Sequence, residues 1–312
     1  MVRNEFTFPS TDGKNRIHAV EWLPDGEVRA VLQIAHGVSE YILRYEPFAA
    51  YLTERGFAVV GHDHLGHGSS IAPGGKPMYF GPKGSWNWVV QDMEQRRVLA
   101  REKFPALPYF LLGHSMGSFL TRTYLIRHPG KVDGAVVMGT GQMIAPLVAG
   151  GKLVAAAESL RVGEENASPI VQMLAFGSYN KIFAPNRTGF DWLSVNPENV
   201  DRYIADPLCG GNPSIGLFRE MLGGISFIGN PEHIKQMDPT APILLISGAM
   251  DPVGDCGKGV RRVYNLFRKA GIRNVTLKLY PELRHEILCE TDRETVFEDV
   301  FRWLCSQIPV NT

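Results

Sequence analysis

The sequence PYFLLGHSMGSFLTRTYLIRH, residues 108–128, carries the strongest local indication of the fold. A short apolar strand runs into the motif GHSMG at residues 113–117, and a helical pattern follows it. In such a strand–turn–helix the serine adopts a strained backbone conformation, and the glycines on either side let neighbouring chain approach closely. The serine hydroxyl then lies at the carboxyl end of a sheet and at the positive end of a helix. We therefore predict that Ser115 is a nucleophile; the alternative is a tight turn with a buried serine.

Strands and helices alternate outward from this motif. Apolar or β-branched runs predict strands at NEFTF (4–8), IHAVEWL (17–23), RAVLQIAH (29–36), FAVVGHD (57–63), PYFLLGH (108–114), VDGAVVMGT (132–140), PILLISG (242–248) and NVTLKLY (274–280). Helices are expected near residues 46–55, 86–103, 119–127, 259–269 and 293–307. This alternation is typical of an α/β fold with a mostly parallel, doubly wound sheet of about eight strands.

Residues 141–238 interrupt the alternation. They contain helical patches at 147–160, 170–176 and 215–222, with Asn-, Pro- and Gly-rich loops between them, and no convincing strand. We interpret them as a mainly helical cap inserted in the sheet domain, with core residues 1–140, cap residues 141–240 and core residues 241–312. A disordered insertion is the alternative, but its many aromatic and aliphatic residues favour packing.

A serine hydroxyl needs a general base, and in hydrolases of this fold class the order along the chain is Ser, then Asp or Glu, then His. His285 is the one histidine after the cap, in the loop that follows the strand 274–280. Asp251 follows the apolar core of the preceding strand and should fix the tautomer of His285. Asp255, deeper in the same loop, is the rival candidate for the acid.

The tetrahedral intermediate of acyl transfer requires two backbone N–H donors. The Met116 amide, directly after the nucleophile, is one candidate. The Val38 amide is the second, because it follows the strand that ends at His36, and Gly37 allows a tight turn there. An ordinary glycine turn is the alternative for this loop.

Four stretches share motifs with a known family: HGVSEYILRYEPFAAYLTERGFAVVGHDHLGHGSS (36–70), GHSMG (113–117), SGAMDPV (247–253) and YPELRHEIL (280–288). The sequence resembles the monoacylglycerol lipase and lysophospholipase branch of the α/β hydrolases, with a serine aminopeptidase S33-type hydrolase domain. The matching positions are His36, Gly37, Glu40, Arg44, Tyr45, Asp63, Gly66, His67, Gly68, Ser69, Tyr280, Pro281, His285 and Glu286. The resemblance covers residues 30–144 and 242–304 and leaves out the cap.

The resemblance implies Ser115, Asp251 and His285 as the catalytic triad, Val38 and Met116 as the oxyanion pair, and ester substrates with an acyl chain. The sequence departs from the family pattern at four places. Ser39 replaces a frequent glycine, Tyr41 a frequent histidine, and His64 and Leu65 stand where an arginine often precedes Gly-His-Gly. These departures concern the pocket mouth and leave the identity of the substrate open.

We expect a serine ester hydrolase acting on monoacylglycerols or lysophospholipid-type esters, without a cofactor or metal. A small-ester carboxylesterase, an amidase or peptidase, and a non-catalytic ligand-binding protein of the same fold are the alternatives. The three histidines His62, His64 and His67 resemble a metal-binding cluster, but Gly66 replaces the aspartate that a metallo-hydrolase would need.

Composition limits the partners. The chain has 32 Lys+Arg and 32 Asp+Glu among 312 residues, so bulk charge does not attract nucleic acid. Four cysteines without paired spacing, Cys209, Cys256, Cys289 and Cys305, indicate reduced thiols. Cys256 is expected to be a buried, inert residue or else a reactive thiol beside the pocket.

No signal peptide or membrane span is recognisable, which predicts a cytoplasmic location. Residues 143, 144, 147 and 148 leave open a transient membrane contact through the cap; the oligomeric state stays unknown.

Overall fold

The computed structural model describes residues 1–309, and its centre is a single eight-stranded sheet. The strand order is β1-β2-β4-β3-β5-β6-β7-β8, with β1 and β2 antiparallel to their neighbours and the rest parallel. The strands are β1 (Val2–Pro9), β2 (Arg16–Leu23), β3 (Ala30–Ala35), β4 (Phe57–His62), β5 (Tyr109–His114), β6 (Gly134–Met138), β7 (Ile243–Gly248) and β8 (Val275–Tyr280). The prediction of a mostly parallel α/β-hydrolase sheet is confirmed.

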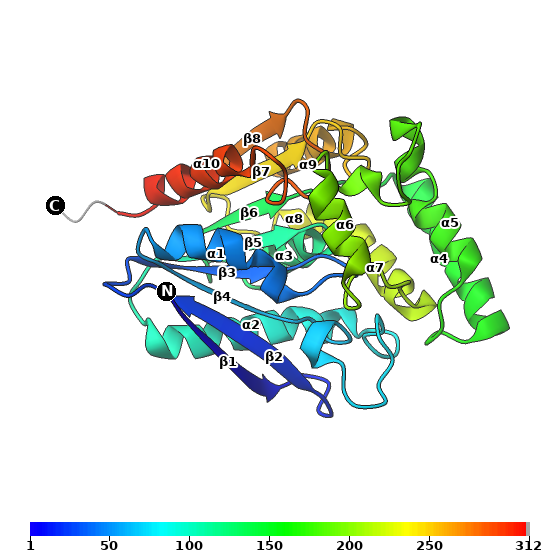
Figure 1. Ribbon diagram of the computed structural model, residues 1–312, viewed down its shortest axis with the longest axis horizontal. Coiled ribbons are helices and arrows are strands. Elements are labelled where there is room, and N and C mark those ends of the chain that lie inside the picture. The colour runs from blue at the N-terminus through cyan, green and yellow to red at the C-terminus, as the bar shows by residue number, and fades with distance from the viewer. Residues whose placement is uncertain (310–312) are drawn as a thin grey trace.

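Helices cover both faces of the sheet (Figure 1). Helices α1 (Glu46–Thr53) and α10 (Arg293–Ser306) share one hydrophobic cluster with one face, while α2 (Trp86–Lys103), α3 (Met116–Arg127) and α9 (Lys258–Lys269) share another cluster with the opposite face. Strands β3, β4, β5, β6 and β7 are buried along their whole length. Their sequences are therefore mostly apolar, with few polar residues, as expected for parallel strands covered on both faces.

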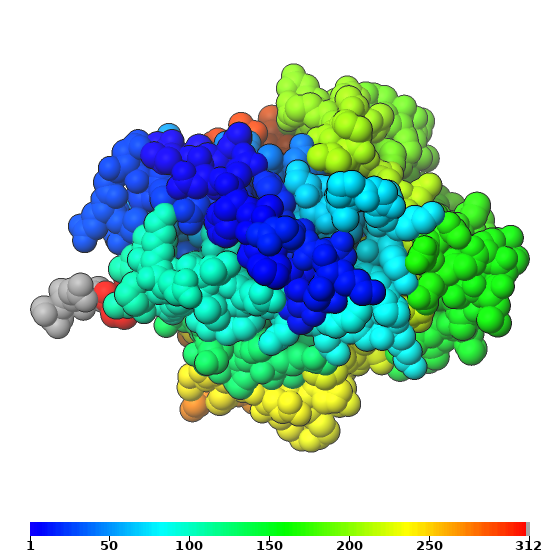
Figure 2. Space-filling view, turned by 90° about the horizontal axis from the view of Figure 1, so that it is seen from below, coloured from blue at the N-terminus to red at the C-terminus, as the bar shows by residue number. Residues whose placement is uncertain are grey.

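The insertion between β6 and β7 is helical, and its helices are longer and more numerous than the expected patches. It contains α4 (Ala145–Val162), α5 (Pro169–Phe176), α6 (Pro197–Ala205), α7 (Ile215–Ile228) and α8 (Pro231–Ile234). These helices gather at one end of the sheet (Figure 1), and the segment of α4 and α5, green in Figure 2, projects from the molecule. Helix α7 also packs against the sheet domain, because Leu217, Ile225 and Ile228 belong to the same hydrophobic cluster as α2 and α3; Val148 of α4 and Ile234 of α8 join this cluster.

The cap lies over the carboxyl ends of the parallel strands. In an open α/β sheet the loops at these ends form the binding crevice. The loops after β3, β5, β7 and β8, which hold the candidate residues of the sequence, therefore meet under the cap. Within residues 1–309, no helix is both long and apolar enough to span a membrane.

Candidate active site

Ser115 stands at a strained turn between β5 and α3. Its backbone has φ 52° and ψ −120°, a conformation that residues with a Cβ rarely adopt. The flanking glycines are required by close packing: a Cβ on Gly113 would come within 2.2 Å of the Gly117 carbonyl oxygen, and a Cβ on Gly117 within 2.0 Å of the Ala35 carbonyl oxygen. The turn that the motif predicts is therefore present, and it places the serine side chain in the cavity under the cap.

The loop after β3 lies against the nucleophile. A Cβ on Gly37 would stand 3.1 Å from Ser115 Cβ and 2.6 Å from Glu40 Oε1, so a larger residue would crowd both side chains. Within residues 1–309, the backbone N–H groups of Val38 and Met116 donate no hydrogen bond to the protein. Two free amide donors beside a serine hydroxyl are what an oxyanion requires. We name residues 36–40 the oxyanion loop.

His285 and Asp251 form a buried pair. His285 Nδ1 lies 3.0 Å from Asp251 Oδ2, and the side chains are 3% and 0% exposed. Burial opposes the charge of Asp251, but His285, the Val253 N–H and the Ser247 hydroxyl together lower its pKa below the ordinary value. The rival candidate, Asp255, lines the cavity but makes no hydrogen bond to His285 in the described residues. The structure thus brings Asp251 to the histidine.

Ser115 and His285 line the same cavity. The described residues include no hydrogen bond between their side chains. Such bonds are often long or poorly aligned in a ligand-free site and tighten when substrate is bound. With Asp251 bonded to Nδ1, the Nε2 atom of His285 is left to accept the serine proton.

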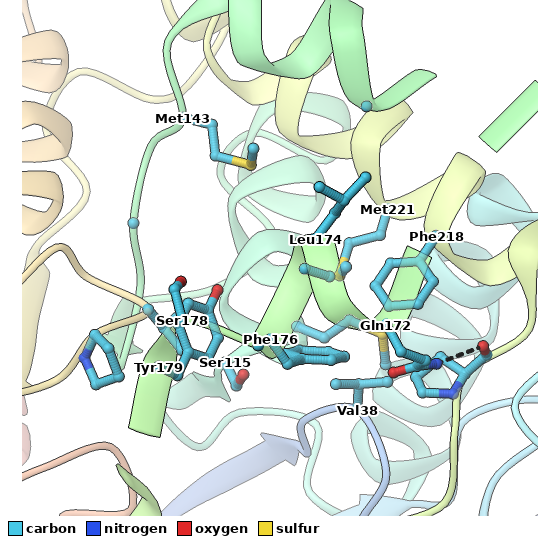
Figure 3. Close-up of a pocket in the computed structure, with 18 of the residues that line it drawn as sticks. Val38, Ser115, Met143, Gln172, Leu174, Phe176, Ser178, Tyr179, Phe218 and Met221 are labelled. Atoms are coloured by element: carbon cyan, nitrogen blue, oxygen red, sulfur yellow. Dashed lines mark hydrogen bonds between the residues drawn. The ribbon is translucent and has the colours of Figure 1, made fainter. Parts of the chain in front are cut away.

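The cavity above Ser115 is large and mostly apolar, with a volume of about 1180 Å³. In Figure 3, Phe176 and Tyr179 lie close to Ser115, while Leu174, Phe218 and Met221 form an apolar group farther along the pocket. These residues come from the cap: α5, the turn after it, and α7. The cap therefore supplies most of the wall that an acyl chain would contact.

A buried network of charges ties the loops of the site together. Arg44 donates to both carboxylate oxygens of Glu286, at 2.7 and 2.9 Å, and to Glu40 at 2.8 Å. Glu40 in turn accepts from the Gly37 N–H at 2.5 Å and lies 3.0 Å from His114 Nδ1. Burial opposes the charge of Glu286, yet Arg44 lowers its pKa. The family motifs include Glu40, Arg44 and Glu286. In the structure these three residues connect the oxyanion loop to the loop after β8, which carries His285.

The cap also contacts the loop after β8, which carries His285. The Glu286 N–H donates to the Leu193 carbonyl at 2.7 Å, and Glu290 accepts from Ser194 Oγ and from the Val195 N–H. The Trp192 ring lies 5.2 Å from the His285 ring, centroid to centroid. Sequence reasoning missed Trp192, because no local pattern marks a cap residue that contacts a histidine almost a hundred positions later.

One expectation about the cysteines was wrong. Cys256 is exposed, and it lies outside the cavity lining, which includes its neighbour Asp255. Partial burial and the nearby carboxylates of Asp255 and Asp251 raise the pKa of its thiol, which opposes formation of a reactive thiolate. The backbone at Asp255 and Cys256 has φ values of 51° and 48°, so the exposed thiol lies in a tight turn. Within residues 1–309, all four cysteines are free thiols.

The three histidines that resemble a metal cluster pack with His36 in the core. Ring centroids of His36 and His64 are 4.1 Å apart, and those of His62 and His64 are 5.1 Å apart. Among the described residues, no group of three or more His, Cys, Asp or Glu side chains has a geometry suited to a metal ion. Both ring nitrogens of His62 are buried, and residues 1–309 offer them no hydrogen-bond partner. Burial lowers the pKa of His36 to about 3 and keeps those of His62 and His64 well below 6.5.

Replacing His62 with leucine is expected to stabilise the protein and to weaken the effect of acid on it. The folded chain keeps His62 neutral, whereas the unfolded chain binds a proton below pH 6.5, so stability falls as the pH drops through that value. Urea unfolding at pH 7.5 and 5.5 should show a loss smaller by about 1 kcal/mol in His62→Leu than in the wild type. Equal losses would contradict the buried neutral state of this residue.

The chain is similar to known proteins in sequence and in fold. Residues 26–292 match the family described as serine aminopeptidase, S33. The monoacylglycerol lipase of Mycolicibacterium smegmatis is 29% identical over 98% of this chain and 99% of its own length. Human monoglyceride lipase is 30% identical over 91% of this chain and 84% of its own length. The crystal structure of a thermostable carboxyl esterase from Bacillus coagulans, in complex with glycerol, superposes with a TM-score of 0.92 at 29% identity and covers 99% of this chain and 100% of its own.

Proposed function

The chain belongs to the serine aminopeptidase S33 family, and we propose that it hydrolyses the carboxylic ester of long-chain monoacylglycerols or of similar single-chain lipid esters. The protein is an ester hydrolase of the monoacylglycerol-lipase type. In the proposed mechanism Ser115 attacks the ester carbonyl while His285 takes its proton, and the Val38 and Met116 amides hold the oxyanion. The alcohol leaves with a proton from His285, and water then hydrolyses the acyl-enzyme.

The observation that carries the proposal is the apolar cavity over the nucleophile. Its volume of about 1180 Å³ exceeds the roughly 300–1,000 Å³ typical of small-molecule pockets, and cap side chains such as Phe176, Phe218 and Met221 line it. Such a wall gains binding energy with each methylene of a substrate, about 0.8 kcal/mol when the group is fully buried. A long acyl chain uses this wall, whereas a short ester leaves most of it unused.

The first experiment measures fatty-acid release from 1-acylglycerols of increasing chain length, with lysophosphatidylcholine alongside and Ser115→Ala as the control. We expect kcat/KM to rise by about fourfold for each added methylene until the cavity is filled. Release only from short soluble esters would contradict the lipid assignment and indicate a small-ester carboxylesterase. Equal rates on the matching amides would favour the amidase alternative.

We further propose that α4 and α5 contact the lipid surface from which the substrate is taken. Leu153 and Leu160 on α4 are 73% and 92% exposed, and Met173 on α5 is 65% exposed. Of the four residues expected at such a surface, Met143, Ile144 and Leu147 are exposed and also line the cavity, whereas Val148 is buried. An apolar face beside the pocket mouth would place the opening against the acyl chains.

The double change Leu153→Asn and Leu160→Asn tests this contact. Neither side chain lines the cavity, so hydrolysis of soluble p-nitrophenyl butyrate should be unchanged. The apparent KM for monoacylglycerol in phosphatidylcholine vesicles should rise by about tenfold, because two leucines no longer enter the lipid. Val98→Asn, an exposed position on α2, is the matched control. An unchanged KM on vesicles would exclude α4 as the contact.

A further inference from the structure

Within residues 1–309, every hydrogen bond between the oxyanion loop and the cap involves Ser39. Its hydroxyl donates to the Gly211 carbonyl at 2.7 Å. Its own carbonyl accepts from the Gly210 N–H at 3.1 Å and from the Tyr203 hydroxyl at 3.1 Å. All three partners belong to residues 203–211 at the end of α6 and in the loop after it, which we name the cap strap. Three bonds therefore connect this loop to a segment more than 160 positions away.

The backbone of Ser39 is held in a conformation that favours glycine. Its φ is 58°, in the left-handed region, where a residue with a Cβ is strained by about 1 kcal/mol or more. The family pattern has a frequent glycine here, so this chain keeps a serine at a position where glycine would be less strained. Strain of this kind persists only where surrounding contacts hold it. The bond from the Ser39 hydroxyl to the strap is such a contact.

Tyr41, the second departure from the family pattern beside this loop, bonds to the same strap. Its hydroxyl donates to Asp206 at 2.8 Å. Arg44 also contacts the strap, because its guanidinium lies over the Tyr203 ring, 5.0 Å from the ring centre. The other two departures, His64 and Leu65, are buried and do not line the cavity. Both departures next to the oxyanion loop thus contact one cap segment.

We propose that Ser39 is a positioning residue that couples docking of the cap strap to formation of the oxyanion hole. The inference rests on the proposed function, in which the Val38 N–H stabilises the oxyanion. Val38 lies between Gly37, which the Glu40 carboxylate fixes from the core side, and Ser39, which the strap fixes from the cap side. The direction of the Val38 N–H is therefore set from both sides. Displacement of the strap frees Ser39, and the Val38 N–H then no longer points at the oxyanion.

The test separates stabilisation of the oxyanion from binding of the substrate. A trifluoromethyl ketone with a long alkyl chain reacts with Ser115: the Oγ–C bond forms, the hydroxyl proton passes to His285, and the carbonyl oxygen becomes the oxyanion. A 1-alkylglycerol ether fills the same cavity without forming an oxyanion. The inhibition constants of both compounds, kcat on monoacylglycerol and the melting temperature are measured for the wild type, Ser39→Gly, Tyr203→Phe and the double variant.

We expect Ser39→Gly and Tyr203→Phe each to weaken inhibition by the ketone about fivefold and to lower kcat by the same factor. Inhibition by the ether should change less than about twofold: Ser39 and Tyr203 line the cavity, but both substitutions leave its apolar wall of α5 and α7 side chains in place. The melting temperature of Ser39→Gly should not fall, since glycine tolerates the backbone conformation. Tyr51→Phe, which loses a hydroxyl bonded to Glu298 on α10, is the control for the tyrosine and should match the wild type.

Equal changes for the ketone and the ether, or no change for the ketone, would overturn the role of Ser39 while leaving the proposed function intact. Failure of the ketone to inhibit the wild-type enzyme, together with no labelling of Ser115 by a fluorophosphonate, would instead overturn the proposed function and the inference with it. The two failures are thus distinguishable in one set of proteins.

Discussion

Ser115→Ala is expected to lower kcat on monoacylglycerol by about 10⁶-fold, the loss seen when the nucleophile of a serine hydrolase is removed. The remaining turnover would come from the free amides of Val38 and Met116 and from binding in the cavity. The fold should not suffer, because the Ser115 side chain makes no hydrogen bond within residues 1–309. Alanine is also no more strained than serine at the same backbone angles.

Ser115→Gly serves as a second variant that separates activity from stability. Its activity should be as low as that of the alanine variant. Its free energy of unfolding should exceed that of Ser115→Ala by about 1 kcal/mol, because glycine adopts φ 52° without a Cβ clash. Rates by fatty-acid release and stabilities by urea unfolding measure both effects. Activity of either variant near the wild-type level would exclude Ser115 as the nucleophile.

Asp251→Asn is expected to lower kcat by about 10⁴-fold through the tautomer of His285. In the wild type, Asp251 Oδ1 accepts from the Val253 N–H at 2.9 Å, and Oδ2 accepts from His285 Nδ1 at 3.0 Å. An asparagine keeps the hydrogen bond from the Val253 N–H only if its side-chain oxygen takes the place of Asp251 Oδ1. Its NH₂ group then faces His285 Nδ1. That donor forces the proton onto Nε2, and the histidine can no longer accept from Ser115.

Two neighbouring variants make this prediction specific. Ser247→Ala removes a second donor to Asp251 Oδ2 but leaves the carboxylate charged, so kcat should fall by less than about tenfold. Asp255→Asn should retain most of the activity, because Asp255 does not bond to His285. Steady-state rates on a soluble ester measure all three. A larger loss in Asp255→Asn than in Asp251→Asn would reverse the assignment of the acid.

Much of the site was predictable because its geometry is encoded in short stretches. A strand, a glycine-flanked serine and a helix lie within 21 residues, and packing leaves room only for glycine at positions 113 and 117. The order of Ser115, Asp251 and His285 follows from where the parallel strands end. The sheet was predictable for the same reason, since strands buried on both faces are short runs of mostly apolar residues.

The remaining features depend on contacts between distant segments. Nothing near Trp192 indicates that it packs on His285, and nothing near Ser39 indicates a bond to Gly211. Cys256 is exposed and lies in a turn with two consecutive residues of positive φ, which composition does not reveal. Helix α6 was missed because Pro197–Ala205 is mostly polar and has only Asn199, Val200 and Tyr203 buried. Such features arise from tertiary packing rather than local pattern.

The most direct test of the central claim is covalent labelling of the folded protein with a fluorophosphonate, followed by intact mass measurement and peptide mapping. The account predicts one adduct per chain, on the peptide that contains Ser115, with no adduct in Ser115→Ala. It also predicts slower labelling of Asp251→Asn, in which His285 cannot take the serine proton. Absence of labelling in folded wild-type protein, or an adduct on another residue, would contradict it.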